Sequence, residues 1–288
     1  MHTMNSNIKS IHDNILEKLI PDLRDLVING IDDSKRIIFI CGKDKTDTES
    51  YRYRVSSFLE KFSHYQLAFP EDLFEDLLEG QANHSLLALE TQLANAVDLI
   101  ILIPESPGSF AELGAFTMLP ELAKKMLVLR QGRYKSDKSF INHGPIRLLK
   151  HHKGKVIDLP SNFNHLDVNH TLPLLKQVRR MAPQGRRKKA LNNILLYQDY
   201  ILLFSYIFDR LDSFYINKLM AKILEKKLTP QEQTACRAAT HSLIRLLLLE
   251  KRDGFFTLTT RGFEEAQRRY FALSKVNDLR IKVMNIQL

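Results

Sequence analysis

The residue of this sequence best suited to chemistry is a glutamate that follows a buried strand and a tight turn. It is Glu112, within the stretch DLIILIPESPGSFAELGAF (98–116). The apolar run at 99–103 is too short for a globular helix and indicates a strand buried on both faces. Two prolines and a glycine then turn the chain, and a helix is expected to begin at Ser109. Ligands of open α/β folds bind at the carboxyl ends of the strands, so we expect Glu112 beside a ligand crevice.

Two roles are open to Glu112. Ser109 and Glu112 fit the S-x-x-E pattern of a capping box, in which each side chain bonds the backbone amide of the other. Alternatively, the Glu112 carboxylate acts on a bound substrate, as a nucleophile or by stabilising positive charge. The rigid turn formed by Pro104, Pro107 and Gly108 is more than a simple cap needs, and it favours the chemical role.

The end of the first expected strand offers a second group of candidate binding residues. Gly42 and Lys43 follow the strand expected at 37–41, and a helix is expected from about 48 to 62. A glycine here lets backbone amides approach a phosphate, and the lysine adds positive charge. Tyr51, in the first helical turns, could reach the same crevice. An ordinary strand-to-helix turn is the alternative, because no complete phosphate-binding motif is present.

Strand and helix patterns alternate from residue 35 to residue 182. Such alternation with short connections predicts a doubly wound parallel sheet with helices on both faces. The expected strands lie at 37–41, 65–69, 99–103, 126–130 and 155–159. Before this α/β domain, the apolar stripe at 8–28 predicts a leading helix, within a segment 1–34, that packs on the domain or on another subunit.

From residue 183 the pattern becomes mainly helical. The expected helices lie at 189–209, 213–227 and 231–250, with a hairpin turn at Asp253-Gly254 and a closing helix from Thr260. This order is typical of a winged helix-turn-helix domain (183–288) with a C-terminal arm. Its third helix carries Arg237, His241 and Arg245 and is the candidate recognition helix. A domain that contacts only protein is the alternative.

Composition excludes several classes of protein. The chain has 288 residues, 44% of them hydrophobic, which is enough for two domains with real cores. No apolar run approaches the roughly 18 residues of a membrane span, and the N-terminus lacks the plan of a signal peptide. Two lone cysteines, Cys41 and Cys236, form neither a disulfide framework nor a zinc-binding spacing. We expect a cytoplasmic protein without membrane contact or bound metal.

The net charge of +9 favours polyanionic partners. An acid-free basic run precedes the helical domain and consists of Arg179, Arg180, Arg186, Arg187, Lys188 and Lys189. Such a run is commonly a solvated linker, but its position beside a candidate DNA-binding domain favours nucleic-acid contact, above all by its last four residues. Three histidines, His143, His151 and His152, could be catalytic, although loop histidines are usually only solvated.

The stretch from Asp98 to Gly114 resembles the nucleoside deoxyribosyltransferase superfamily, whose pattern is D-x-G-x-x-x-E-x-G after a buried strand. Here the pattern is occupied by Ser106, Gly108, Glu112 and Gly114. The resemblance implies that Glu112 is the catalytic nucleophile, attacking the anomeric carbon of a nucleoside. It also implies a second catalytic carboxylate at Glu90 and substrate contacts by Asp98, Ser106, Gly108 and Ser109, with Gly42, Lys43 and Tyr51 at the first strand end.

The departure from the family pattern at Ser106 bears on the substrate. The family has an aspartate there that handles the base, and a serine puts ordinary deoxyribosyl transfer in doubt. Nicotinamide leaves NAD as a neutral base and needs little acid help, so the replacement favours NAD. We therefore expect cleavage of an N-glycosidic bond in NAD or another nucleotide, which enters as substrate; no cofactor is expected.

The order of the two domains resembles the effector proteins of bacterial retrons. This implies a toxin of anti-phage defence that is held in check by a reverse transcriptase and its branched RNA–DNA (msDNA), within a larger oligomeric assembly. Two other functions stay open. A salvage-type deoxyribosyltransferase would exchange bases between nucleosides, and a nucleotide-sensing DNA-binding regulator would bind duplex DNA without turnover.

Overall fold

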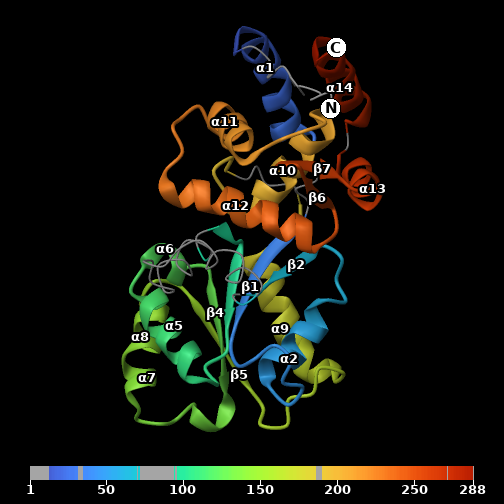
Figure 1. Cartoon of the computed structure of the whole chain (residues 1–288). Coiled ribbons are helices and arrows are strands. Elements are labelled where there is room, and N and C mark those ends of the chain that lie inside the picture. The colour runs from blue at the N-terminus through green and yellow to red at the C-terminus, as the bar shows by residue number, and fades with distance from the viewer. Residues whose placement is uncertain are drawn as a thin grey trace. The chain divides into compact units, whose positions relative to one another are not determined.

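The computed structural model describes residues 13–31, 35–69, 71, 94, 96–185, 190–270 and 272–287. The chain forms two compact units (Figure 1). One consists of residues 33–188 and is called the α/β unit; the other joins residues 1–32 to residues 189–288 and is called the helical unit. The first helix of the chain therefore belongs to the same unit as its last hundred residues.

A parallel sheet forms the centre of the α/β unit. Its strands are β1 (Arg36–Cys41), β2 (Tyr65–Ala68), β3 (Leu99–Leu102), β4 (Met126–Gln131) and β5 (Lys155–Leu159). Their order is β2-β1-β3-β4-β5, and every neighbouring pair is parallel. This confirms the α/β fold and all five expected strands.

Helices cover both faces of this sheet (Figure 1). On one side lie α2 (Tyr51–Leu59) and α9 (Val168–Met181), and on the other α5 (Pro107–Thr117), α6 (Pro120–Ala123), α7 (Phe140–His143) and α8 (Pro145–His151). Every residue of β1 and β3 is buried, as a strand covered on both faces requires. Ile38, Ile40 and Ile101 join the core beneath α2 and α9. Each such side chain contributes about 1.5–3 kcal/mol by leaving water.

The strand order creates a switch point at the carboxyl ends of β1 and β3. From β1 the chain moves outward to β2, and it then returns past β1 to β3. The loops that leave β1 and β3 consequently diverge to opposite faces of the sheet. In doubly wound folds the crevice between two such loops is the usual ligand site.

Several helix limits differ from those expected. α2 begins at Tyr51 with Ser50 as its N-cap, rather than at Thr48, because the Ser50 hydroxyl accepts the Tyr53 amide. The helix expected to begin at Ser109 ends at Thr117 as α5, and Pro120 then starts a separate helix, α6. Between β4 and α8 lie a short 3-10 turn, η1 (Gly132–Tyr134), and α7. α9 was not predicted at all.

The helical unit is built around α10 (Tyr197–Ile207), in which the residues from Tyr200 to Ile207 are all buried. The other elements are α1 (Asp13–Asn29), η2 (Ile194–Leu196), α11 (Ser213–Leu224), α12 (Pro230–Arg245), β6 (Leu249–Arg252), β7 (Phe255–Leu258), α13 (Thr260–Arg269) and α14 (Leu273–Gln287). The hairpin β6–β7 turns at Asp253 and Gly254, whose φ angles are 50° and 86°. Positive φ at both positions is the signature of a type I′ turn, so the predicted hairpin is confirmed.

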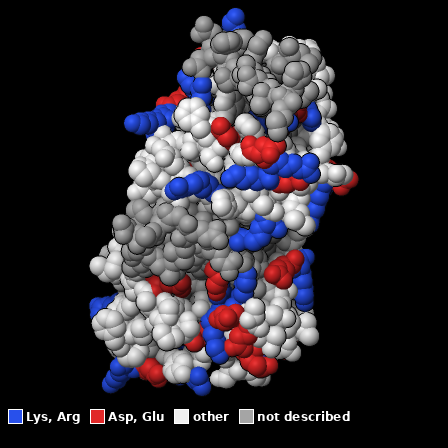
Figure 2. Space-filling view, in the orientation of Figure 1, with Lys and Arg blue, Asp and Glu red and all other residues white. Residues whose placement is uncertain are grey.

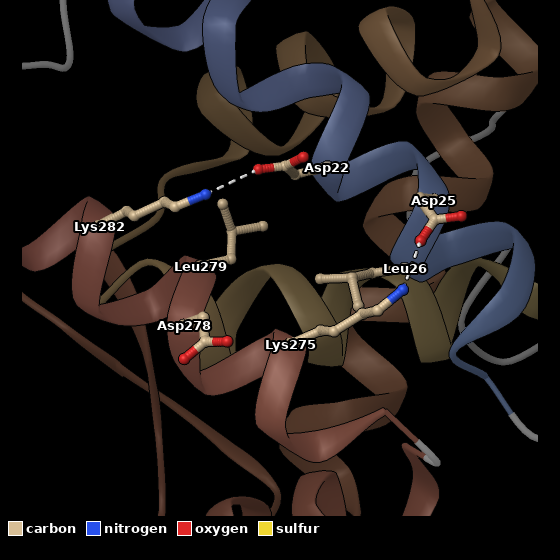
Figure 3. A pocket seen from close by; sticks show the side chains of 7 residues that line it. All are labelled: Asp22, Asp25, Leu26, Lys275, Asp278, Leu279 and Lys282. Atoms are coloured by element: carbon tan, nitrogen blue, oxygen red, sulfur yellow. Dashed lines mark hydrogen bonds and ion pairs between the residues drawn. The ribbon is translucent and has the colours of Figure 1, made fainter.

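The first helix packs within the helical unit. Leu16, Leu19 and Leu23 are buried in one core with residues of α10, α11 and α14. The expectation that this helix packs on the α/β domain is therefore corrected: its apolar stripe is covered by the C-terminal helices. Two ion pairs flank a cavity of about 220 Å³ between α1 and α14, Lys282–Asp22 at 3.1 Å and Lys275–Asp25 at 3.6 Å (Figure 3).

Within the described ranges, no helix has both the length and the apolar character that crossing a bilayer would demand.

Candidate active site at the carboxyl edge of the sheet

Glu112 lies on α5, the helix that follows β3. The helix begins two residues earlier than expected, because Pro107 occupies its first turn and Ser106 is its N-cap. The capping box is formed by Ser106 and Ser109, so the expected pairing of Ser109 with Glu112 is wrong. Glu112 is the sixth residue of the helix, half-buried, and beyond the first turn. The cap therefore does not account for this glutamate.

Ser109 ties the turn between β3 and α5 together. Its buried hydroxyl oxygen accepts the amides of Glu105 and Ser106 at 3.0 and 2.9 Å and donates to the Ser106 carbonyl at 2.8 Å. The Ser106 hydroxyl donates to the carbonyl of Gly42 at 3.0 Å. This bond joins the ends of β1 and β3 at the switch point. Ser106 and Ser109 thus shape the edge of the crevice.

Glu105, which the sequence analysis did not select, has a structural role here. Its carboxylate accepts the backbone amides of Tyr51 at 2.9 Å, Arg52 at 3.0 Å and Lys43 at 3.3 Å. These amides belong to the start of α2 and the turn after β1, where a bound phosphate was one of two possibilities. A carboxylate of the chain itself occupies that position and complements the positive end of the helix dipole. The available signal was an acidic residue three positions after the end of β3, in the turn at the switch point.

The close approach of Glu105 and Arg52 explains why residue 42 is a glycine; its backbone angle does not require one. A Cβ at Gly42 would lie 3.0 Å from Arg52 Cβ and 3.1 Å from Glu105 Oε1. Lys43 is exposed, and its ammonium lies 2.5 Å from Asp47 Oδ2, which raises the pKa of the lysine. Of the two possibilities for this turn, phosphate binding and an ordinary strand-to-helix turn, these contacts within the chain favour the second, and the Lys43 side chain lies at the same edge.

Arg52, in the first turn of α2, is a buried charge beside the crevice. Its guanidinium donates to the Lys43 carbonyl at 2.7 Å and to both carboxylate oxygens of Glu71, at 2.5 and 2.7 Å. The Phe69 ring lies 5.3 Å from the guanidinium carbon. A buried arginine needs such paired acceptors, and here they connect the ends of β1 and β2. Arg52 therefore fixes the loop geometry beside the crevice.

Two further residues predicted to bind substrate, Tyr51 and Asp98, lie at opposite edges of the sheet. Tyr51 stays at the carboxyl edge, where its hydroxyl donates to the Ser161 carbonyl at 3.1 Å, just after β5. Asp98 precedes β3 and lies at the opposite edge, where its carboxylate accepts the Ile37 amide at 2.9 Å and pairs with Arg36 at 3.4 Å. The strand between the edges spans about 13 Å at about 3.3 Å per residue. Asp98 and Glu112 are thus not brought together.

Gly108, at the start of α5, differs from Gly42. A Cβ added there would meet no described atom within 4 Å. Packing among the described residues therefore does not require this glycine. Glu90 lies outside the described residues, as do Arg186, Arg187, Lys188 and Lys189. In the part of the chain that the structure describes, no group of three or more His, Cys, Asp or Glu side chains could hold a metal ion.

The predicted recognition helix is present as α12. Thr229 and Glu232 form its capping box, and Arg237, His241 and Arg245 lie exposed at successive turns. The helix ends at Arg245, earlier than expected, because Leu247 adopts a φ of 57° and β6 begins at Leu249. Basic side chains lie over the part of the surface where α12 runs (Figure 2). A helix followed by a hairpin is the arrangement of a winged helix.

Two curated relatives resemble this chain. The "Retron Ec86 putative ribosyltransferase/DNA-binding protein" of Escherichia coli is 35% identical over 269 residues, covering 88% of this chain and 85% of the relative. The "Retron Ec73 putative ribosyltransferase/DNA-binding protein" of the same organism is 35% identical over 122 residues, covering 40% of this chain and 38% of the relative.

A family model also matches the chain. The model describes the STM3845 retron effector protein and covers residues 48–252. That range includes the switch point, Glu112, α12 and the start of the hairpin. More than half of the chain is matched, and the Ec86 relative is aligned over most of both lengths. The chain therefore belongs to the STM3845 retron effector protein family.

Proposed function

We propose that this protein is a retron effector that cleaves the N-glycosidic bond of NAD or another nucleotide, with Glu112 as the nucleophile. The observation that carries the proposal is the position of Glu112. It lies on the helix after β3, beside the switch point, and it takes no part in the capping box that would otherwise explain it. The Ec86 relative is named a "putative ribosyltransferase/DNA-binding protein", and this name supports glycosyl chemistry.

The chemistry follows from the charge that develops on the sugar. Breaking the bond between C1′ and the base builds positive charge on the ribose ring, and a carboxylate near C1′ stabilises that charge or bonds to the carbon. Attack by Glu112 forms a glycosyl–enzyme ester as the base departs with the bonding electrons. Water then attacks C1′ and releases Glu112 in a hydrolase, whereas a second base does so in a transferase.

The surroundings of Ser106 support NAD as the substrate. The Ser106 hydroxyl donates its proton to the Gly42 carbonyl, and both oxygens of Glu105 accept backbone amides. Neither side chain is arranged to protonate a departing base. Nicotinamide leaves without protonation, so this edge of the site suits a nicotinamide nucleotide better than a purine nucleoside.

Control by nucleic acid is the second part of the proposal. The helical unit carries α12, with its exposed Arg237 and Arg245, followed by the hairpin β6–β7. We assign to it the contact with the RNA–DNA product of the retron reverse transcriptase, with the basic residues from Arg186 to Lys189 as further contacts. The name of the Ec86 relative includes DNA binding, which supports this assignment. In this proposal the enzyme is restrained until the complex is disturbed.

The test is nicotinamide release from NAD by the purified protein, with and without its nucleic-acid partner. Glu112→Gln keeps the shape of the side chain but removes the nucleophile, and it should lower release by at least about 1,000-fold. Glu121→Gln, which changes an exposed glutamate of the neighbouring α6, is the matched control and should retain activity. Undiminished release by a folded Glu112→Gln protein would remove Glu112 from the mechanism. Analysis of the products separates hydrolysis from transfer to a second base.

A further inference from the structure

The surface over α7 and α8 combines apolar and basic side chains in an unusual way. Residues 131–155 contain seven lysines and arginines and one acid, Asp137. All seven basic side chains are exposed. Two aromatic rings are exposed among them, Phe140 with 82% and Tyr134 with 43% of its surface accessible. Over α7 and α8, Figure 2 shows mainly uncharged surface with basic and acidic side chains at its margin.

A groove runs between α5, α7 and α8 and contains Phe140. Its volume is about 500 Å³, within the range of sites that hold a nucleotide-sized group. Met118, Pro145 and Leu148 give it an apolar lining beside Phe140. The cationic or protonatable groups that line it are Arg147, His143 and His151. Among the described residues no acid forms an ion pair with Arg147. The groove therefore offers an apolar, ring-sized space with positive charge at its side.

The local folding explains why Phe140 stays exposed. Ser139 caps α7 by accepting the Asn142 amide, and the Asn142 side chain binds the carbonyls of Tyr134 and Asp137 at 2.8 and 2.7 Å. The Asn142 side-chain oxygen, Oδ1, accepts a hydrogen bond from the Arg130 guanidinium at 2.7 Å. These bonds hold the four-residue helix against η1. Phe140, at its first position, is thereby held out at the surface, so the ring is presented without a large ordering cost on binding.

We propose that this surface binds single-stranded nucleic acid, with a base stacked on Phe140 in the groove and the backbone phosphates on Arg147 and the neighbouring lysines. Exposed aromatic rings interleaved with basic side chains are the hallmark of single-strand binding, since every base has a face that can stack. In a duplex the faces of the bases are covered. The excess of positive charge in residues 131–155, seven basic side chains against one acid, disfavours a basic partner and suits a polyanion. The surface lies in the α/β unit, so it is distinct from the contact proposed for α12.

The test measures binding by the full chain of fluorescently labelled 20-nucleotide strands, one of deoxythymidine and one of uridine. Phe140→Ala should weaken binding about tenfold, because stacking of one base is lost. Arg147→Glu should weaken it by a similar factor and reduce the salt dependence, because a phosphate contact is lost. Lys176→Glu, on α9 at the other face of the sheet, makes the same change of charge and should have less than about a twofold effect. Phe214→Ala, an equally exposed ring of the helical unit, is the aromatic control.

Photocrosslinking locates the contact independently of the helical unit. A strand carrying 5-iodouracil should crosslink to the peptide that contains Phe140, and an unlabelled single strand should compete better than a duplex of equal length. Crosslinks confined to the helical unit, equal losses in the control variants, or equal competition by the duplex would each overturn the proposal. The proposal would also be overturned if Phe140→Ala changed the self-association of the protein but not its binding of the single strand. Binding is the readout, so this result and the outcome for NAD cleavage are independent.

Discussion

Glu105 places a carboxylate where many α/β proteins bind a phosphate. The amides of Lys43, Tyr51 and Arg52 all donate to it, which satisfies the start of α2 from within the chain. A phosphate at this position would have to displace the glutamate and lose its charge-assisted hydrogen bonds. A substrate at the switch point is therefore better held from the α5 side, where Glu112 lies.

Gly42 and Gly108 allow a matched test of whether a glycine of the site is required by packing within the chain or by the approach of a ligand. Gly42→Ala should reduce the free energy of unfolding by about 1–3 kcal/mol, because the new Cβ meets Arg52 and Glu105 at 3.0–3.1 Å. Gly108→Ala should leave stability unchanged or raise it by up to about 1 kcal/mol, because the space is open and alanine favours a helix. Urea unfolding measures both. If a stable Gly108→Ala protein loses NAD cleavage, a ligand approaches this position; equal destabilisation by the two changes would contradict the packing argument.

At the scale of the element, the residue at which a helix begins decides which side chains cap it and which remain available to a ligand. Pro107 lets α5 start two residues earlier in the chain than expected. Ser106 is therefore the N-cap, and Glu112 lies beyond the first helical turn. α12, by contrast, begins with a complete capping box, in which the side chains of Thr229 and Glu232 each accept the other's backbone amide. Burial alone would raise the pKa of Glu232, but hydrogen bonds from Lys226 and Thr229 lower the pKa below its ordinary value.

The depressed pKa of Glu232 predicts an acid-sensitive helical unit. A carboxyl whose pKa is lower in the folded state contributes stability above its unfolded pKa, and this contribution is lost as pH falls through the folded value. Stability should therefore decline below about pH 4.5, the ordinary pKa of the group. Glu232→Gln should be less stable at pH 7 and should lose less on acidification, as measured by urea unfolding at pH 7 and pH 4. Glu264→Gln, an exposed glutamate of α13, is the control. An unchanged acid response in Glu232→Gln would contradict the assignment.

At the scale of the whole molecule, one unit is built from the two ends of the chain. α1 contributes Leu16, Leu19 and Leu23 to the core that α10, α11 and α14 complete. The α/β unit has its own core beneath α2 and α9. Loss of the first helix should consequently damage the helical unit while the sheet stays intact.

A pair of core truncations tests this division. Leu23→Ala and Leu174→Ala each remove a fully buried side chain, in the helical and the α/β unit respectively, and each should cost about 2–5 kcal/mol. Hydrogen exchange of the full chain should show faster exchange in α11 and α14 for Leu23→Ala. For Leu174→Ala the faster exchange should lie in α2 and α9. The same exchange pattern in both variants would mean that the two cores do not act separately.

The sequence by itself determined the elements whose patterns are local. The five strands are short apolar runs bounded by turn residues, the hairpin needs positive φ at Asp253 and Gly254, and α12 begins with a complete capping box. Such signals depend only on neighbouring residues, so they can be identified without knowledge of the fold. The placement of Glu112 on the helix that follows β3 could likewise be predicted from neighbouring residues alone.

Only the tertiary structure decided which residues meet. The strand order set Glu105 against the start of α2, separated Asp98 from Glu112 by the length of a strand, and packed α1 on helices more than 170 residues away. An apolar stripe shows that a face will be buried, but many partners could cover it equally well. A carboxylate likewise accepts whichever amides the fold brings to it. Partner choice depends on the free energy of the whole packed chain, which no local pattern contains.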